Sequence, residues 1–254
     1  MMKSIYLFTM DCLIRNGSPK KGAVELLDLL YRQQVPFAVM SQQSGKSREK
    51  VIVEMRRAGF TVFRHANLYT SSMAAVDFLS SRYGEKNRAA LIGGEGVKEA
   101  VNKAGYVIDR LHPDFIFIGM DRGLNYEDYC EINAMIEDGG ILVSVDDRQR
   151  QVVDSQKMIG NGAVVTMLEH ASGTDAIHFG IGSPLYLDMV IRYLNADPSS
   201  IVAVGTSFHR DIVPCIHKGM TTVYVTEGRS IVNEGMNEKI HPDYIVEDLS
   251  GLTR

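Results

Sequence analysis

The chain has 254 residues, of which 45% are hydrophobic and 23% charged, enough for one large α/β domain or two smaller ones. Its net charge is −4 without any basic block, which excludes nucleic acid and anionic membranes as expected partners. No apolar run approaches the roughly 20 residues of a membrane-spanning helix, and we expect no signal peptide.

Short runs rich in Val, Ile and Leu alternate with helix-like stretches from end to end. The predicted strands span 4–8, 36–41, 88–93, 114–120, 141–145, 200–205 and 221–226. The predicted helices span 22–34, 48–59, 70–84, 95–105, 125–140, 162–173, 185–194 and 211–219, with loops following residue 145. This alternation is typical of a doubly wound α/β protein with a parallel sheet.

The three cysteines, Cys12, Cys130 and Cys215, are far apart and have no Cys-x-x-Cys spacing. This pattern predicts reduced thiols in a cytoplasmic protein rather than a disulfide framework or a zinc site.

Polar residues stand where several predicted strands end. Thr9 and Asp11 follow the first strand, Ser41 closes the second, and Thr206 follows the strand at 200–205. Ligands of open parallel sheets bind beyond the carboxyl ends of the strands. If these strands are neighbours, the residues converge on one crevice. Asp11 is expected in the loop after its strand.

These strand ends resemble the four motifs of the haloacid dehalogenase superfamily of phosphatases. The strings "PKKGAVELLDLLYRQQVPFAVMSQQS", "IGGEGVKEAV", "HPDFIFIGMDRGLNYEDY" and "SPLYLDMVIRYL" resemble its NagD-like, p-nitrophenyl-phosphatase-type branch in order and spacing. The resemblance covers essentially the whole chain. It implies a Rossmann-like core at 1–85 and 174–254, an inserted α/β cap domain at 86–173, and a homodimer formed through the cap.

The resemblance also implies a two-step phosphoryl transfer. In the family, a carboxylate after the first strand attacks phosphorus, and a second carboxylate two residues on acts as acid and base. A Ser/Thr and a Lys hold the phosphoryl oxygens, and Mg²⁺ is held by the nucleophile, a backbone carbonyl and an acid of the fourth motif. Carboxylates suit the roles of nucleophile and of metal ligand, because they are ionised at neutral pH and supply the oxygen ligands that Mg²⁺ prefers.

Three chemical positions of the family pattern are substituted in this chain. Thr9 occupies the position of the nucleophile, Ile181 that of the phosphate-binding Lys, and Thr206 that of the magnesium-binding acid. Loss of the nucleophile alone costs about 10⁴ to 10⁶ in rate, by analogy with protease knockouts. We therefore expect an impaired enzyme in which no residue binds Mg²⁺ strongly, although Mg²⁺ is the cofactor of the family.

Other positions keep the pattern or change it differently. Asp11 matches the acid/base position, Ser41 the phosphate-binding hydroxyl, and Asp211 the second acid of the fourth motif, while Gln42 and Gln43 replace an Asn pair. In the cap, "SVDDRQ" replaces a Thr-Asn-Pro-Asp loop, which makes Asp146, Asp147 and Arg148 the expected substrate loop.

Four of these residues also have a structural interpretation. Asp11 could bond to loop amides, Ser41 could be a turn hydroxyl, Asp211 could cap a helix, and Ile181 could be an extra core residue.

Three functions remain open. The first is an impaired phosphatase homologue that binds an anion, a small phosphorylated molecule or a protein partner. The second is a weakly active metal-dependent hydrolase of small phosphoesters that uses Asp11 and a metal site rearranged around His209 and Asp211. The third is a non-catalytic, oligomeric regulatory protein.

Overall fold

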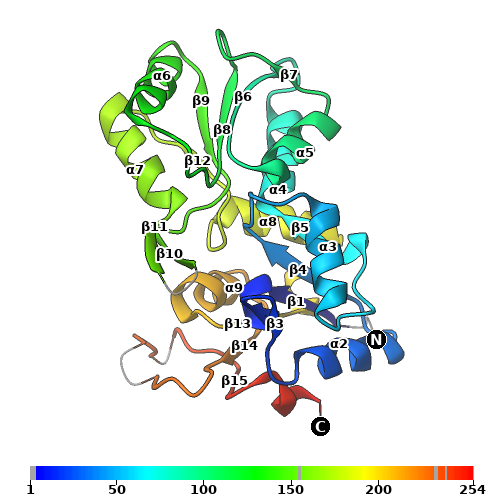
Figure 1. Cartoon of the computed structure of the whole chain (residues 1–254). Coiled ribbons are helices and arrows are strands. Elements are labelled where there is room, and N and C mark those ends of the chain that lie inside the picture. Colours follow the sequence, from blue (N-terminus) through cyan, green and yellow to red (C-terminus); the bar gives the residue numbers. More distant parts are fainter. Residues whose placement is uncertain (1–3, 154–155, 232–233, 238, 254) are drawn as a thin grey trace. The chain divides into compact units, whose positions relative to one another are not determined.

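The structure is a computed structural model that describes residues 4–153, 156–231, 234–237 and 239–253 (Figure 1). No helix in these ranges is long and apolar enough to cross a membrane.

The chain forms two compact units. The first comprises Met1–Ser41, Glu49–Tyr69 and Val190–Arg254, and the second comprises Gln42–Arg48 and Thr70–Met189. These limits differ from the domain boundaries expected at 85/86 and 173/174. The second unit includes helix α4 (Ser71–Arg82), which packs against α5 (Glu95–Lys103). It extends beyond residue 173, where β12 (Ile177–His178) pairs with β9 (Ile141–Ser144). The inserted cap at 86–173 stays a prediction.

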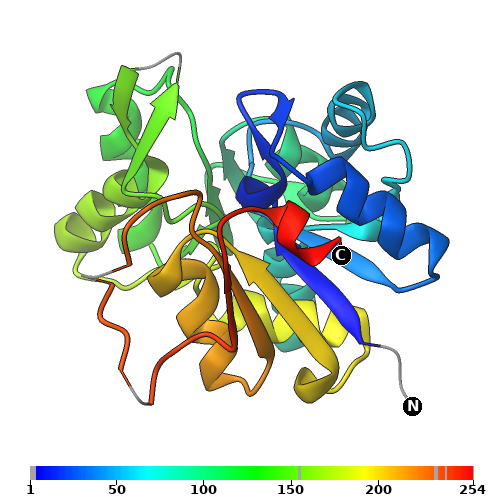
Figure 2. The same cartoon turned by 90° about the horizontal axis from the view of Figure 1, so that it is seen from below.

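A six-stranded sheet forms the centre of the first unit, in the order β15-β14-β13-β1-β4-β5. The strands are β1 (Ile5–Thr9), β4 (Phe37–Ser41), β5 (Leu68–Thr70), β13 (Ile201–Gly205), β14 (Thr221–Val225) and β15 (Tyr244–Val246). β1 pairs in parallel with both β4 and β13, and Figure 2 shows β1 in blue beside β13 in gold. The predicted parallel sheet is confirmed, and with it the neighbouring strand ends.

Helices α2 (Ala23–Arg32), α3 (Arg48–Arg57) and α9 (Val213–His217) accompany this sheet. The apolar residues of α2 and α3 pack with the sheet in one cluster that includes Phe8, Leu27, Val39 and Ile52. All five residues of β4 are buried, as expected for a parallel strand covered on both faces.

The second unit contains a five-stranded parallel sheet in the order β12-β9-β8-β6-β7. Its strands are β6 (Arg88–Ile92), β7 (Val107–Ile108), β8 (Phe115–Ile118), β9 (Ile141–Ser144) and β12 (Ile177–His178). Its helices are α4 (Ser71–Arg82), α5 (Glu95–Lys103), α6 (Tyr126–Glu137) and α7 (Asn161–Ser172), while α8 (Pro184–Leu194) has residues in both units. The predicted elements of this region are therefore confirmed in type and order.

Three local predictions were wrong. The expected loops after residue 145 contain an antiparallel hairpin of β10 (Arg150–Val153) and β11 (Gln156–Ile159). The sequence did not indicate this hairpin, because β11 is largely exposed and has no alternating apolar face. Asp11 lies in a single helical turn, α1 (Met10–Leu13), and not in a loop. The helix expected at 211–219 begins earlier, with a π-helical turn at Phe208–Ile212 that precedes α9.

Candidate functional site

The carboxylate of Asp211 is the centre of the polar cluster at the strand ends of the first unit. Its Oδ2 accepts hydrogen bonds from Thr9 Oγ1 at 3.3 Å and from the backbone N–H groups of Thr206 and Ser207, both at 3.0 Å. Its Oδ1 accepts one from Arg210 Nε at 2.7 Å. The Asp211 side chain is 0% exposed, so these donors replace water as its solvation.

Local sequence explains why Asp211 reaches this place. Gly205 ends β13, and a Cβ there would lie 2.4 Å from the Cβ of Asp211, so the close approach requires glycine. Phe208 and Ile212 are buried with Tyr224 and anchor the turn that carries Asp211. Asp211 does not cap the helix that follows it: it lies inside the π-helical turn Phe208–Ile212, and its carboxylate accepts from the N–H groups of Thr206 and Ser207, which precede that turn.

Arg210 links the two carboxylates that the chain retains from the family pattern. Its Nη2 lies 3.1 Å from Asp11 Oδ2, while its Nε binds Asp211. Burial lowers the pKa of the guanidinium, but the charges of Asp211 and Asp11 raise it by more, so its pKa stands above the usual value. A permanent positive charge therefore lies between Asp11 and Asp211. This contact could not be predicted from the sequence, because nothing in a spacing of 199 residues indicates that Arg210 meets Asp11.

A second arginine, Arg229, binds the backbone carbonyl oxygen of Thr206, directly after β13. Arg229 donates from Nη2 to the backbone oxygen of Thr206 and from Nε to that of Thr226, the latter at 2.9 Å. Thr206 is therefore fixed at its N–H by Asp211 and at its carbonyl by Arg229.

The residues present do not fit the Mg²⁺ that the resemblance implies. Thr9 and Thr206 supply neutral hydroxyls where the family has charged ligands, and the Asp211 oxygens already accept several hydrogen bonds. No group of three or more His, Cys, Asp or Glu side chains in the described part of the chain is arranged to hold a metal ion. His209 packs edge-on against Phe208 at 5.3 Å between ring centroids. The rearranged metal site with Asp11, His209 and Asp211 is thus not found there.

Cys12, the residue after Asp11, has a structural role. Its thiol is buried and lies 3.6 Å from the carbonyl oxygen of Val204, to which it donates a weak hydrogen bond. Burial, and next the charge of Asp211, raises the pKa of this thiol far above its ordinary value. Cys12 is therefore neutral and unreactive.

In the second unit, Gln42 and Ile181 lie together. The backbone N–H of Ile181 donates to Gln42 Oε1 at 2.9 Å, and both side chains are buried. Gln42 Nε2 is buried without a hydrogen-bond partner among the described residues. The position that carries a Lys in the family is thus occupied here by the buried apolar side chain of Ile181, beside the side-chain amide of Gln42. Ser41, in the first unit, is buried as the last residue of β4.

The residues of the expected substrate loop form hydrogen bonds with one another and with α7 in the second unit. The buried carboxylate of Asp146 accepts the backbone N–H of Arg148 at 3.1 Å and its Nε at 2.8 Å. Asn161 Nδ2 donates to the backbone oxygen of Asp146 at 2.8 Å. These bonds fix the loop against α7, and its role in substrate selection stays a prediction.

Asp147, the third residue of this loop, belongs to a network that the sequence did not indicate. Its Oδ1 accepts from Ser144 Oγ at 2.5 Å and lies 2.9 Å from His178 Nδ1, and its Oδ2 accepts the N–H of Gly180 at 2.8 Å. His178 Nε2 lies 3.0 Å from Glu169 Oε1. The hydrogen bond with Asp147 raises the pKa of His178 more than burial lowers it, and Glu169 adds to the increase, giving a pKa of about 9.

The raised pKa predicts how this network responds to pH. The folded-state pKa of His178 is above its unfolded value of about 6.5, so the ion pairs contribute their full stabilisation below that value. They lose it as the pH rises through about 9. A proton NMR titration should show His178 titrating near 9, and Glu169→Gln should bring its pKa closer to 6.5. A titration of His178 at 6.5 in the unaltered chain would contradict the geometry of this network.

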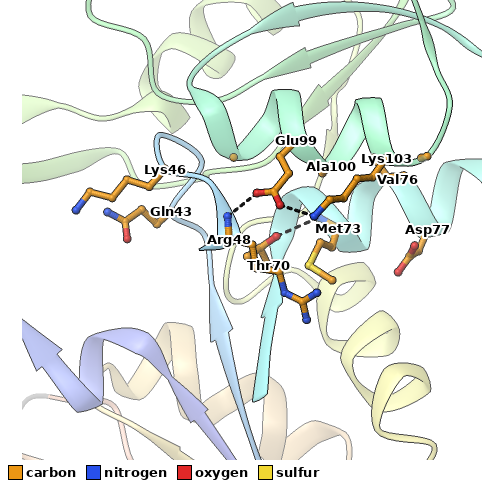
Figure 3. A pocket seen from close by; sticks show the side chains of 12 residues that line it. Gln43, Lys46, Arg48, Thr70, Met73, Val76, Asp77, Glu99, Ala100 and Lys103 are labelled. Carbon is orange, nitrogen blue, oxygen red and sulfur yellow. Dashed lines mark hydrogen bonds and ion pairs between the residues drawn. The ribbon is translucent and has the colours of Figure 1, made fainter. Parts of the chain in front are cut away.

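A separate cavity of about 200 Å³ lies within the second unit, between residues 42–48, α4 and α5 (Figure 3). Met73, Val76 and Ala100 supply apolar wall, and Lys103 donates to Glu99 at 2.5 Å on its rim. Of the residues predicted from the sequence, only Gln43, the second residue of the substituted Asn pair, belongs to its described lining. The carboxylate of Glu99 on this cavity is engaged by Lys103 and by the N–H of Arg48.

Two family models and several curated proteins match this chain in sequence. Residues 8–107 match the family model described as haloacid dehalogenase-like hydrolase, and residues 179–252 match a second model described as HAD-hydrolase-like. An acid sugar phosphatase of Staphylococcus aureus is 25% identical over 247 residues, which cover 96% of this chain and 95% of the relative.

Solved structures have the same fold. NagD from Escherichia coli K-12 superposes with a TM-score of 0.88 at 22% identity, covering 98% of each chain. A p-nitrophenyl phosphatase from Archaeoglobus fulgidus gives 0.87 at 20% identity, covering 99% of this chain and 98% of its own. The predicted doubly wound fold is confirmed by these superpositions.

Proposed function

Because this chain belongs to the haloacid dehalogenase-like hydrolase superfamily and is a NagD-like phosphatase homologue, we propose that it is a catalytically impaired member that binds an anion or a small phosphorylated ligand. The observation that carries the proposal is the set of contacts around Asp211. The site that should present a free nucleophilic carboxylate presents a threonine hydroxyl, which donates to a carboxylate already bonded to two amides and a guanidinium.

The chemistry of Thr9 supports impairment. A hydroxyl attacks phosphorus efficiently only if a base removes its proton. The nearest carboxylate, on Asp211, accepts the Thr9 hydrogen bond at 3.3 Å but is also the acceptor for three other donors. Asp11, at the acid/base position, is paired with Arg210. Neither carboxylate is therefore available as an unencumbered base.

Support for anion binding comes from the donors that remain. Arg210 is partly exposed, with 30% of its side chain accessible, and guanidinium groups bind phosphoryl oxygens in a fork geometry. Arg229 lies at the neighbouring strand end. With Arg210 and Arg229 beside Asp11 and Asp211, this edge of the sheet carries no net excess of negative charge to repel an anion.

The test compares turnover with binding. p-Nitrophenyl phosphate and a sugar phosphate, chosen because relatives are named acid sugar phosphatases, should be hydrolysed with Mg²⁺ no faster than by the Asp11→Asn variant. Inorganic phosphate should nevertheless raise the midpoint of thermal unfolding, as a ligand of the folded state does. Mg²⁺-dependent turnover that disappears in Asp11→Asn would contradict the proposal and favour the active hydrolase.

A further inference from the structure

We propose that Arg210 is a resident cation of the site, which takes the charge-neutralising place of the family's divalent ion and excludes Mg²⁺ from the remaining carboxylates. This inference rests on the proposed function only in taking the site to be one that has lost its metal ligands. It assigns to Arg210 a role that no motif of the family pattern indicates.

The geometry is that of a bridge. Arg210 binds Asp211 through Nε and Asp11 through Nη2, at 2.7 and 3.1 Å, so one planar guanidinium is shared by two carboxylates. The Asp211 side chain is 0% exposed, and a buried carboxylate requires a compensating charge. Arg210, the residue before Asp211, supplies that charge, so the site does not need a bound metal ion to balance Asp211.

The backbone of the turn permits this contact. Neighbouring residues of an α-helix point away from each other, so consecutive Arg and Asp side chains do not normally pair. Arg210 and Asp211 lie instead in the π-helical turn Phe208–Ile212, where Asp211 also folds back onto the N–H groups of Thr206 and Ser207. The same turn therefore presents both the carboxylate and its cation.

A divalent ion would meet two obstacles at this place. It would lie close to a fixed positive charge, which repels it. It would also have to displace Arg210 to use the paired oxygens of Asp11 and Asp211, since Mg²⁺ needs a near-octahedral set of oxygens that are not already engaged. Restoring acids at positions 9 and 206 therefore removes only part of the barrier to metal binding.

The experiment measures metal affinity directly, by titrating Mn²⁺ into the full chain and following free Mn²⁺ by electron paramagnetic resonance. Thr9→Asp/Thr206→Asp is compared with the same protein carrying Arg210→Gln. We expect removal of the guanidinium to tighten Mn²⁺ binding by about tenfold or more. Arg210→Lys keeps the positive charge and should leave the affinity low.

Arg56→Gln is the matched control, because Arg56 is a cation of the same unit that binds the backbone oxygen of Phe63 and makes no described bond to Asp11 or Asp211. It should change Mn²⁺ affinity by less than about twofold. The single Arg210→Gln variant, tested in the otherwise unaltered chain, should also bind Mn²⁺ more tightly and does not depend on the folding of the multiple variants.

Equal Mn²⁺ affinity with and without Arg210 would overturn the inference, whatever the phosphatase activity. Turnover by the unaltered chain would instead overturn the proposed function, and leaves the effect of Arg210 on metal affinity as a separate result.

Discussion

The triple variant Thr9→Asp, Ile181→Lys and Thr206→Asp is expected to hydrolyse p-nitrophenyl phosphate in Mg²⁺ at least about 100-fold faster than the unaltered chain. The substitutions return an ionised nucleophile, a phosphate-binding cation and a charged metal ligand to the positions of the family pattern. Full recovery is not expected, because Arg210 still bridges Asp11 and Asp211. Initial rates at saturating Mg²⁺ measure the effect.

Two further variants sharpen this prediction. Adding Asp11→Asn to the triple variant should return the rate to background, since it removes the acid/base group. Adding Arg210→Gln should lower the Mg²⁺ concentration needed for half-maximal rate. A folded triple variant without any gain in rate would contradict the view that these three positions account for the impairment.

Replacing Asp211 by Ala is expected to cost about 3–4 kcal/mol of unfolding free energy, the range for breaking a buried charge pair, set below its upper end because Arg210 is partly exposed. The change removes the acceptor for Thr9, for two backbone amides and for Arg210 in one step. Urea unfolding should give a lower midpoint with little change in slope, and the thermal midpoint should fall by roughly 6–16 °C.

Asp11→Ala is the control for Asp211→Ala. The Asp11 side chain is 49% exposed and pairs with the same guanidinium, so its loss should cost less than about 1 kcal/mol. Similar losses for the two variants would show that burial of Asp211 does not govern the stability of the strand end.

The strand ends were predictable because their signals are local. Runs such as "SIYLF" and "SIVAVG" are apolar and rich in β-branched or aromatic residues. Parallel pairing of β1 with β13 then brings Thr9 and Thr206 to one edge of the sheet. The family resemblance identified the substituted positions in the same way, since each motif is read within a few residues of a strand.

The contacts that determine the chemistry were not predictable from the sequence. Arg210 meets Asp11 across 199 residues, and His178 meets Asp147 across 31, and neither distance follows from periodicity or spacing. The π-helical turn was also missed, because apolar periodicity predicts an ordinary helix and cannot reveal that Asp211 folds back onto its own amides. The hairpin of β10 and β11 lacks the buried face on which such predictions depend.

The most direct test of the account is whether the unaltered chain ever carries a phosphoryl group. The protein is incubated with p-nitrophenyl phosphate and Mg²⁺, quenched in acid, and its intact mass is measured, with the triple variant as the positive control. We predict a phosphorylated species in the triple variant and none in the unaltered chain, whose position 9 has no carboxylate. An acid-stable phosphoryl adduct on the unaltered chain, lost on Thr9→Ala or Asp11→Asn, would contradict the account.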